Sequence, residues 1–150
     1  NEFLCSCHGY GDFELRVKLK LVNGNGNGGV QFRSQRVKDS RAMSGYQADM
    51  ADGYWGGLYD ESRRRNFLGT RLNAAAMAAA LKRDDWNAYV IRCEGSRIRL
   101  WLNGVLTLDY TEPDSTIPLA GRIGLQIHEG APSEACYKDI ELEELNPAHK

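Results

Sequence analysis

The sequence has little net charge and no long apolar run. Its 19 basic and 20 acidic residues leave a net charge of −1, so no bulk electric field favours nucleic acid or an anionic membrane. No apolar segment approaches the ~20 residues that a membrane-spanning helix needs. We therefore expect neither a nucleic-acid partner nor a membrane span. No repeat, linker or low-complexity tract divides the chain, and residues 1–150 are predicted to form a single domain.

Cysteine is also scarce, and its spacing fits no zinc site. A Cys-x-Cys pair, Cys5 and Cys7, strains a direct bridge, and no second pair has the spacing of zinc ligands. We expect four buried or half-buried free thiols. Two alternatives stay open: a metal site that adds His8 to the pair, and a bridge between Cys93 and Cys136 if their strands are adjacent. No acidic loop clearly supplies calcium ligands, so we predict no metal and no cofactor.

Several segments alternate between apolar and polar residues, which is typical of half-buried antiparallel strands. The clearest is DFELRVKLKL at residues 12–21. The Asn/Gly-rich residues 23–29 then predict a hairpin turn, with a return strand beginning at residues 30–34. Further strands are expected at residues 86–93, 97–102, 105–110, 121–128 and 138–145, with Ile140 and Leu142 of the last one facing inward.

Two other segments are not strands. Residues 72–81, LNAAAMAAAL, predict a short helix because alanine is the best helix former. The arginine triplet at residues 63–65 is expected to be a solvated loop, with a phosphate-binding or acidic-partner role as the alternative. Many short strands with Gly and Asn turns and one helix predict an all-β sandwich.

The stretch from Gly45 to Glu61, GYQADMADGYWGGLYDE, combines four aromatic, four acidic and four glycine residues with a glutamine. Flat rings present a face to the C–H surface of a sugar, while carboxylates and amides bind its hydroxyls. The mixture therefore favours one wall of a carbohydrate site. The alternative is an aromatic-rich hairpin that only packs.

Seven segments follow one another in a recognisable order over nearly the whole chain: YGDFELRVKLKL, GVQFRSQ, GYQADM, YWGGLYDE, WNAYVIRCEGSRIRLWLNG, GRIGLQIHEG and YKDIELEEL. Together they resemble the 3-keto-disaccharide hydrolase family. The resemblance implies a concanavalin A-like jelly-roll β-sandwich of two curved antiparallel sheets, with a ligand cleft on the concave sheet. It also implies cleavage of glycosides whose glucose ring carries a ketone at C3, in a bacterial protein that is periplasmic or secreted.

One departure from the family concerns the N-terminus. Members that resemble this chain usually carry a further segment before the part that matches residues 1–4. We expect either that the chain is a fragment or that the sandwich is completed differently.

Strand alternation predicts which polar residues gather on one face. On each segment the apolar residues take one side of the strand, which leaves polar side chains on the other. If the strands are neighbours, one surface collects Gln31, Arg33, Gln47, Asp49, Tyr59, Glu61, Gln126 and His128, with Tyr54 and Trp55 at its rim. The alternative is a polar solvent face like that of residues 12–21.

The expected chemistry needs a base, an oxyanion donor and an acid. A ketone at C3 acidifies the C2 proton, and its removal allows the C1 substituent to leave. We predict Glu61 or Asp49 as the base and His128 as the acid or proton shuttle, because its ring titrates near neutral pH. His8 and His149 are expected to take no part.

Arg33 completes the predicted catalytic set, and the remaining predicted residues bind the substrate. Arg33, with Gln31 or Gln47, is predicted to hold the ketone oxygen. The other expected substrate contacts are Tyr54, Trp55, Tyr59 and Gln126.

Three rival functions remain. A non-catalytic carbohydrate-binding module needs the same aromatics and amides but no base. A retaining glucanase needs two facing acids, yet the chain has no Glu-x-Asp-x-x-Glu pattern, and the adjacent Asp60 and Glu61 point to opposite faces. A laminin-G-like interaction domain has no positive feature beyond the fold class.

Overall fold

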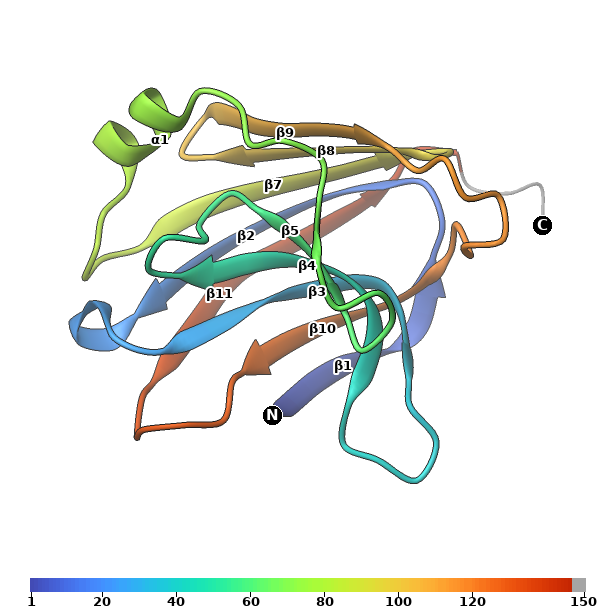
Figure 1. Ribbon diagram of the computed structural model, residues 1–150, viewed down its shortest axis with the longest axis horizontal. Helices are drawn as coiled ribbons and strands as arrows, with labels where there is room; N and C mark the ends of the chain where they lie inside the picture. Colours follow the sequence, from blue (N-terminus) through green and yellow to red (C-terminus); the bar gives the residue numbers. More distant parts are fainter. Residues whose placement is uncertain (147–150) are drawn as a thin grey trace.

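The computed structural model describes residues 1–146, which form two antiparallel sheets packed face to face (Figure 1). The six-stranded sheet has the order β1 (Glu2–Tyr10), β10 (Gly121–Ile127), β3 (Asn27–Arg36), β4 (Met43–Ala51), β5 (Leu58–Glu61) and β6 (Phe67–Leu68). The five-stranded sheet has the order β11 (Ala135–Glu144), β2 (Phe13–Leu21), β7 (Asn87–Glu94), β8 (Arg97–Leu102) and β9 (Val105–Thr111). The predicted all-β sandwich is confirmed.

The core lies between the two sheets and is built from alternate residues of each strand. On β2 the buried set is the predicted one: Phe13, Leu15, Val17, Leu19 and Leu21. Across the core, β3 and β4 contribute Val30, Phe32, Tyr46, Ala48 and Met50, all fully buried. Two inward faces of this kind interdigitate in a sandwich. The opposite faces of both sheets are therefore left for other roles.

Most predicted elements occur where the pattern placed them. The helix α1 covers Ala74–Ala80, and the strands β7 to β11 match the five predicted in the second half. At the end of the chain, Leu142 packs against the core, but Ile140 is half exposed because β11 bulges between Lys138 and Glu141. No helix within residues 1–146 is both long and apolar enough to cross a bilayer.

The hairpin predicted after β2 is wrong. A 3-10 turn, η1 (Val22–Gly24), leads the chain from β2 in one sheet to β3 in the other. In a hairpin the two strands would lie side by side in one sheet. Here their apolar faces pack against each other across the core, so the connection crosses between the sheets.

Two of the three arginines in the triplet, Arg63 and Arg64, are not solvated, whereas Arg65 is exposed as predicted. Asp60 faces inward and is fully buried, and it forms ion pairs with Arg63, at 2.8 Å, and with Arg64. Arg64 also pairs with Glu112 at 2.7 Å, and the Tyr46 hydroxyl donates to the same carboxylate at 2.7 Å. Burial by itself would raise the pKa of Glu112, but the hydrogen bonds from Arg64 and Tyr46 lower it to about 2. This cluster ties the turn after β5 to the other sheet.

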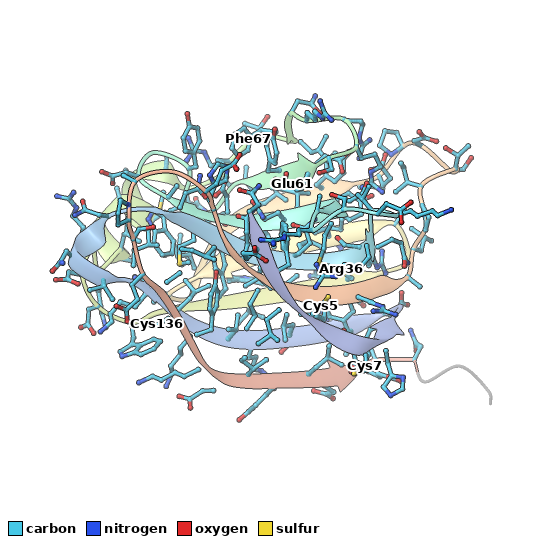
Figure 2. The ribbon with its side chains drawn as sticks, turned by 90° about the horizontal axis from the view of Figure 1, so that it is seen from below. Cys5, Cys7, Arg36, Glu61, Phe67 and Cys136 are labelled. Atoms are coloured by element: carbon cyan, nitrogen blue, oxygen red, sulfur yellow. The ribbon has the colours of Figure 1, made fainter. Side chains whose placement is uncertain are left out.

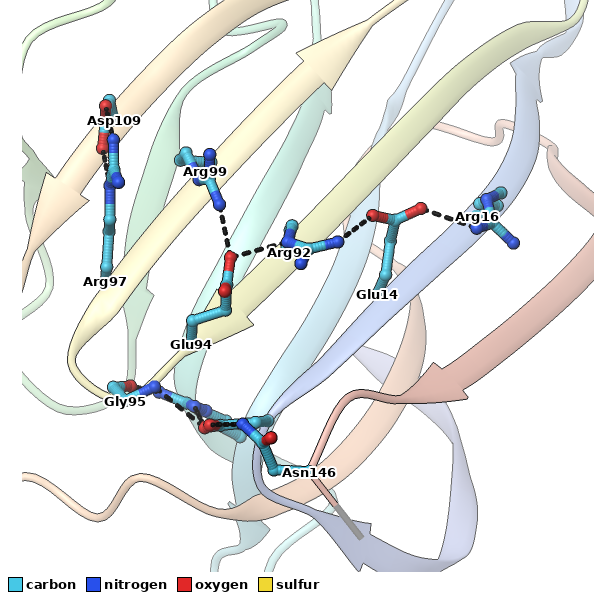
Figure 3. A network of polar contacts seen from close by, with 11 residues as sticks. Glu14, Arg16, Arg92, Glu94, Gly95, Arg97, Arg99, Asp109 and Asn146 are labelled. Atoms are coloured by element: carbon cyan, nitrogen blue, oxygen red, sulfur yellow. Dashed lines mark hydrogen bonds and ion pairs between the residues drawn. The ribbon is translucent and has the colours of Figure 1, made fainter.

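The outer face of the five-stranded sheet carries a row of ion pairs across β2, β7 and β8 (Figure 3). Glu14 accepts from Arg16 at 2.7 Å and from Arg92 at 2.8 Å, and Arg92 continues to Glu94 at 2.6 Å. Arg99 ends the row on Glu94. This outer face is polar, as the alternation on residues 12–21 predicts. Its charged groups pair with one another, and surface ion pairs of this kind contribute little to stability.

All four cysteines are free thiols, as expected. Cys93 is fully buried, and burial raises the pKa of its thiol to about 12. Cys136 cannot bridge to it, because β11 and β7 lie on opposite sides of β2. Cys7, by contrast, is exposed rather than half-buried (Figure 2).

Arg33 leaves the alternation of β3 at a bulge. The register with β4 shifts between Phe32 and Gln35, and Arg33 has a φ of 44°. Its side chain is completely buried and donates to the carbonyls of Gly11 and Gly95, at 3.0 and 2.6 Å, and to Asp12 at 3.0 Å. The prediction that Arg33 faces the site is therefore wrong, because the bulge turns the residue inward to join the two sheets.

We expect Arg33→Ala to lower the free energy of unfolding by about 3–5 kcal/mol, because it leaves a partly buried carboxylate and two carbonyls without their partner. Urea unfolding measures this change. Arg97→Ala is the matched control: Arg97 forms an exposed ion pair with Asp109, and such pairs contribute less than about 1 kcal/mol. Equal losses in the two variants would contradict the role of Arg33 as a tie between the sheets.

Candidate functional site

A pocket of about 240 Å³ opens on the outer face of the six-stranded sheet, opposite the core. Its lining consists of Asn27, Gln47, Asp49, Tyr54, Tyr59, Glu61, Phe67 and His128. We refer to it as the Asp49 pocket. Glu61 and Phe67 both lie in the upper part of Figure 2, near the edge of this sheet formed by β5 and β6.

Strand register brings these residues together. Gln47 of β4 lies opposite Tyr59 of β5, and directly opposed residues share a face of the sheet. The neighbouring odd-numbered residues Asp49 and Glu61 therefore project on that same face. The end of β10 closes the group, because the backbone N–H of His128 donates to the carbonyl of Asn27 at 2.9 Å.

Three aromatic rings form one wall of the pocket. Tyr54 and Phe67 stack with centroids 5.2 Å apart and planes 7° from parallel, and Tyr59 meets Phe67 edge-on at 5.1 Å. The turn that presents Tyr54 contains Gly53 and Gly56, whose φ values of 81° and 80° favour glycine. Tyr54 and Phe67 are 49% and 42% exposed, so their rings are open to a ligand.

Asp49 is a buried carboxylate without an ion-pair partner among the described residues. Burial, with a smaller contribution from the nearby charge of Glu61, raises its pKa to about 7. A hydrogen bond from the backbone N–H of Met50, at 2.8 Å, and the charges of His128 and Arg71 oppose this rise. A carboxylate with a pKa near 7 is suited to accept a proton at neutral pH. Perturbed groups of this kind cluster in functional sites.

Glu61 and His128 complete the titratable set. Burial raises the pKa of Glu61, while the charge of His128 opposes that change. The Nδ1 atom of His128 lies 2.7 Å from the carbonyl of Glu129, which orients the ring. Two carboxylates and an imidazole therefore share one small pocket.

Gln31 and Gln126 project on the same face of the sheet as the pocket residues, as predicted, but neither lines the pocket: Gln31 lies opposite Gln47, and Gln126 lies opposite Gly29, which in turn lies opposite Asp49. Gln31 is fully buried; it accepts a hydrogen bond from Gln47 at 3.1 Å and donates to the carbonyl of Gly45 at 3.1 Å, so it holds Gln47 in place. Gln126 is also buried, and neither of its amide atoms has a hydrogen-bond partner within residues 1–146. Neither residue is part of the pocket lining, and Gln31 supports the pocket through its hydrogen bond with Gln47.

Two tyrosines of the five-stranded sheet support the pocket strands from the core side. The Tyr89 hydroxyl donates to the Asp49 carbonyl at 2.7 Å and accepts from the Gly56 N–H at 2.6 Å. The Tyr137 hydroxyl donates to the Gln126 carbonyl at 2.5 Å and accepts from the N–H of Gly29 at 3.0 Å. The backbone on both sides of the pocket is thus anchored to the opposite sheet.

The structure therefore brings together six of the predicted residues: Gln47, Asp49, Tyr54, Tyr59, Glu61 and His128. Trp55 does not reach the rim, contrary to the prediction. It is buried and stacks on Tyr89 with centroids 6.2 Å apart, because the turn sends Tyr54 outward and the next residue inward. Arg33 is also absent, as the bulge requires. The roles of the six residues stay predictions.

Sequence reasoning missed two lining residues, Asn27 and Phe67. Asn27 lies in the Asn/Gly-rich segment assigned to a turn, and its Oδ1 is buried without a hydrogen-bond partner in the described chain. Phe67 follows the arginine triplet and carries no periodic pattern. The apolar pair Phe67-Leu68 within a polar segment was its only signal. Of the two histidines expected to take no part, His8 lies outside this pocket, and His149 falls beyond the described residues.

No group of three His, Cys, Asp or Glu side chains within residues 1–146 is arranged to hold a metal ion. The alternative of a site at Cys5, Cys7 and His8 therefore gains no support.

Fold and pocket together define a class: a jelly-roll β-sandwich with a carboxylate-lined, aromatic-walled pocket on the outer face of one sheet. Residues 1–143 match the family model described as the 3-keto-alpha-glucoside-1,2-lyase-like domain. The chain belongs to this family, which confirms the resemblance and supports a carbohydrate-related function. Among curated proteins, none matches the chain.

Solved structures share the fold at low sequence identity. Two proteins from Parabacteroides distasonis, provisionally named glycosyl hydrolases, superpose with TM-scores of 0.67 and 0.66 at 19% and 15% identity. These matches cover 96% and 94% of this chain and 83% and 75% of those chains. The carbohydrate-binding module CBM66 from Bacillus subtilis superposes with a TM-score of 0.66 at 17% identity, over 94% of this chain and 80% of the module.

We expect Asp49→Asn to stabilise the fold at alkaline pH. The pKa of Asp49 rises from 3.8 to about 7 on folding, so its stabilising proton is fully retained below pH 3.8 and is lost as the pH rises through about 7. Asparagine does not ionise and can still accept from the Met50 N–H. The variant should therefore gain roughly 4 kcal/mol over the wild type at about pH 8.

Urea unfolding at several pH values measures this difference, which should shrink towards zero near pH 4. Asp52→Asn is the control, because the Asp52 side chain is 77% exposed, and its effect should not depend on pH in this way. A gain for Asp49→Asn that stays constant with pH would contradict the raised pKa.

Proposed function

We propose that the domain cleaves 3-keto-glycosides by base-assisted elimination, followed by addition of water. The observation that carries this proposal is Asp49: a buried carboxylate whose pKa is raised to about 7 in a pocket that also holds Glu61 and His128. Membership of the 3-keto-alpha-glucoside-1,2-lyase-like family supports the same chemistry.

Asp49 serves as the base in this mechanism. It removes the proton at C2, which the ketone at C3 acidifies, and the C2–H electron pair forms an enolate. The enolate then forms the C1–C2 double bond, and the bond from C1 to the leaving oxygen breaks with its electron pair going to that oxygen. His128 supplies the proton that neutralises the leaving group. Water adding across the double bond gives the 3-keto sugar and completes a hydrolysis.

Amide groups replace Arg33 as the binders of the ketone oxygen. Gln47 lines the pocket with its side chain fixed by Gln31, and its Nε2 keeps a second N–H beyond the one that it donates to Gln31. Asn27 also lines the pocket, and its donor is the Nδ2 group, because an amide oxygen only accepts. Hydrogen-bond donors held in place before the reaction stabilise a developing oxyanion without reorganising. Burial is the main reason that the pKa of Asp49 lies near neutral pH, and the negative charge of Glu61 adds to the rise.

The aromatic wall binds the sugar ring. Tyr54 and Phe67 present exposed faces beside the carboxylates, and ring faces bind the C–H surface of a sugar. This feature alone also fits the second candidate function, a non-catalytic carbohydrate-binding module. That module would bind a plain glycan on the same wall, without any need for Asp49 to ionise.

Replacement of the base should remove activity. We expect Asp49→Asn to lower kcat by about 10²–10⁴-fold, the usual contribution of a positioned base, in an assay of methyl 3-keto-α-glucoside consumption. In the wild type, kcat/KM should rise with pH through about 7 as Asp49 loses its proton. Asp52→Asn is the control and should behave as the wild type.

The outcome that excludes the assignment is unchanged turnover in Asp49→Asn, Glu61→Gln and His128→Ala. The domain is instead a binding module if the folded wild type consumes no 3-keto-glycoside and if the wild type and Asp49→Asn bind an unoxidised glucan equally well.

Loss of the aromatic wall should weaken binding more than chemistry. We expect Phe67→Ala to raise KM about tenfold with little change in kcat, since a ring contact of about 1.4 kcal/mol corresponds to that factor. Leu119→Ala is a matched control, because Leu119 is an apolar residue of similar exposure, 43%, outside the pocket. A KM unchanged in Phe67→Ala contradicts the role of the wall.

A further inference from the structure

A second pocket lies on the other side of the aromatic wall. It encloses about 220 Å³ and shares Tyr54 and Phe67 with the Asp49 pocket. The rest of its lining consists of Gly57, Leu58, Leu68, Gly69 and Arg71. We refer to it as the Arg71 pocket. No carboxylate is among these residues, so its only charge is positive.

Arg71 is held in place at the mouth of this pocket. Its Nη1 donates to the carbonyl of Gly53 at 2.8 Å and to that of Trp55 at 3.3 Å. Both carbonyls belong to the turn that presents Tyr54. The Nε and Nη2 donors of Arg71 have no hydrogen-bond partner within residues 1–146. The guanidinium is therefore anchored to the turn through Nη1, and its Nε and Nη2 donors remain unused.

Arg71 also forms no ion pair, in contrast to most arginines of the described chain, although its charge lowers the pKa of the more distant Asp49. Those that form ion pairs are Arg16, Arg33, Arg41, Arg63, Arg64, Arg83, Arg92, Arg97 and Arg99. Arg71 has no carboxylate within ion-pair distance among the described residues. A planar guanidinium with free donors binds carboxylates in a bidentate way, so this site is suited to an anionic group.

The walls of the Arg71 pocket favour a flat apolar ring. Leu58 and Leu68 line the pocket as buried aliphatic residues, so its accessible apolar surface is the aromatic surface of Tyr54 and Phe67. Gly57 keeps the space next to Phe67 narrow but open: a Cβ there would lie 3.1 Å from the Phe67 ring. Apart from Arg71 and the Tyr54 hydroxyl, no lining side chain can bind the hydroxyls of a second sugar.

We propose that the Arg71 pocket binds the leaving group of the glycoside and selects an aromatic leaving group that carries a carboxylate. This inference rests on the proposed function of the Asp49 pocket. The leaving group is joined to C1 by one oxygen, so it must lie beside the sugar ring. A ligand with its sugar in the Asp49 pocket and its leaving group in the Arg71 pocket would contact Tyr54 and Phe67, which line both pockets. The carboxylate then pairs with Arg71.

The test compares three substrates: the methyl, para-carboxyphenyl and para-carbamoylphenyl 3-keto-α-glucosides. The two aryl compounds have the same shape and differ in charge. We expect the wild type to prefer the carboxylate about tenfold in kcat/KM. Arg71→Gln should reduce this preference to about one, while Arg71→Lys keeps part of it. Because the charge of Arg71 also lowers the pKa of Asp49, turnover of the methyl compound is measured in each variant and serves as the reference for the aryl pair. Arg97→Gln removes the same charge from the opposite sheet and should change nothing.

The outcomes separate the two proposals. If the methyl compound is consumed but the aryl pair reacts equally, or the preference survives Arg71→Gln, the inference about Arg71 is wrong while the proposed function stands. If none of the three is consumed, the proposed function is wrong. Calorimetry with the two unoxidised aryl glucosides then tests ligand binding in the Arg71 pocket independently of turnover. Tighter binding of the carboxylate compound that is lost in Arg71→Gln supports the inference about this pocket, and equal binding of the two compounds overturns it.

Discussion

The pocket depends on hydrogen bonds that tyrosine hydroxyls make across the core. Tyr89 and Tyr137 rise from the five-stranded sheet, and each hydroxyl binds one carbonyl and one N–H of the strands and turn that carry the pocket. A buried backbone group left without a partner costs about 1–3 kcal/mol. These bonds therefore fix the distance between the two sheets next to the pocket. Asp49 is one of the residues held in this way, through its own carbonyl.

On that backbone, the carboxylate of Asp49 lies buried with no ion-pair partner within residues 1–146. Elsewhere in the described chain, carboxylates are stabilised by arginines, and the pKa values of Glu14, Glu94, Asp109 and Glu112 are lowered although burial opposes this. In the pocket the direction reverses: burial raises the pKa of Asp49 and of Glu61. The difference marks the pocket as a place where a proton can move near neutral pH.

The alternation of strand residues explains where sequence reasoning succeeded. On β4 and β5 the period of two runs without interruption from Gly45 to Met50 and from Leu58 to Glu61, so the pocket residues could be placed on one face without a structure. On β3 the same rule misplaced Arg33, because one bulge inverts the faces of the strand after Phe32. Nothing in the local sequence announces that bulge; it depends on partners supplied by Asp12 and Gly95.

The sequence by itself determined the sandwich class, the family, nearly every strand of the second half and the polar face of β4, because these follow from local periodicity and from motifs in fixed order. Tertiary structure alone decided that β2 and β3 belong to different sheets, that Trp55 turns inward while Tyr54 stays outside, and that Asn27, Phe67 and Arg71 adjoin the site. Each of those outcomes depends on which distant surface buries a side chain, and that competition is settled only when the two sheets pack.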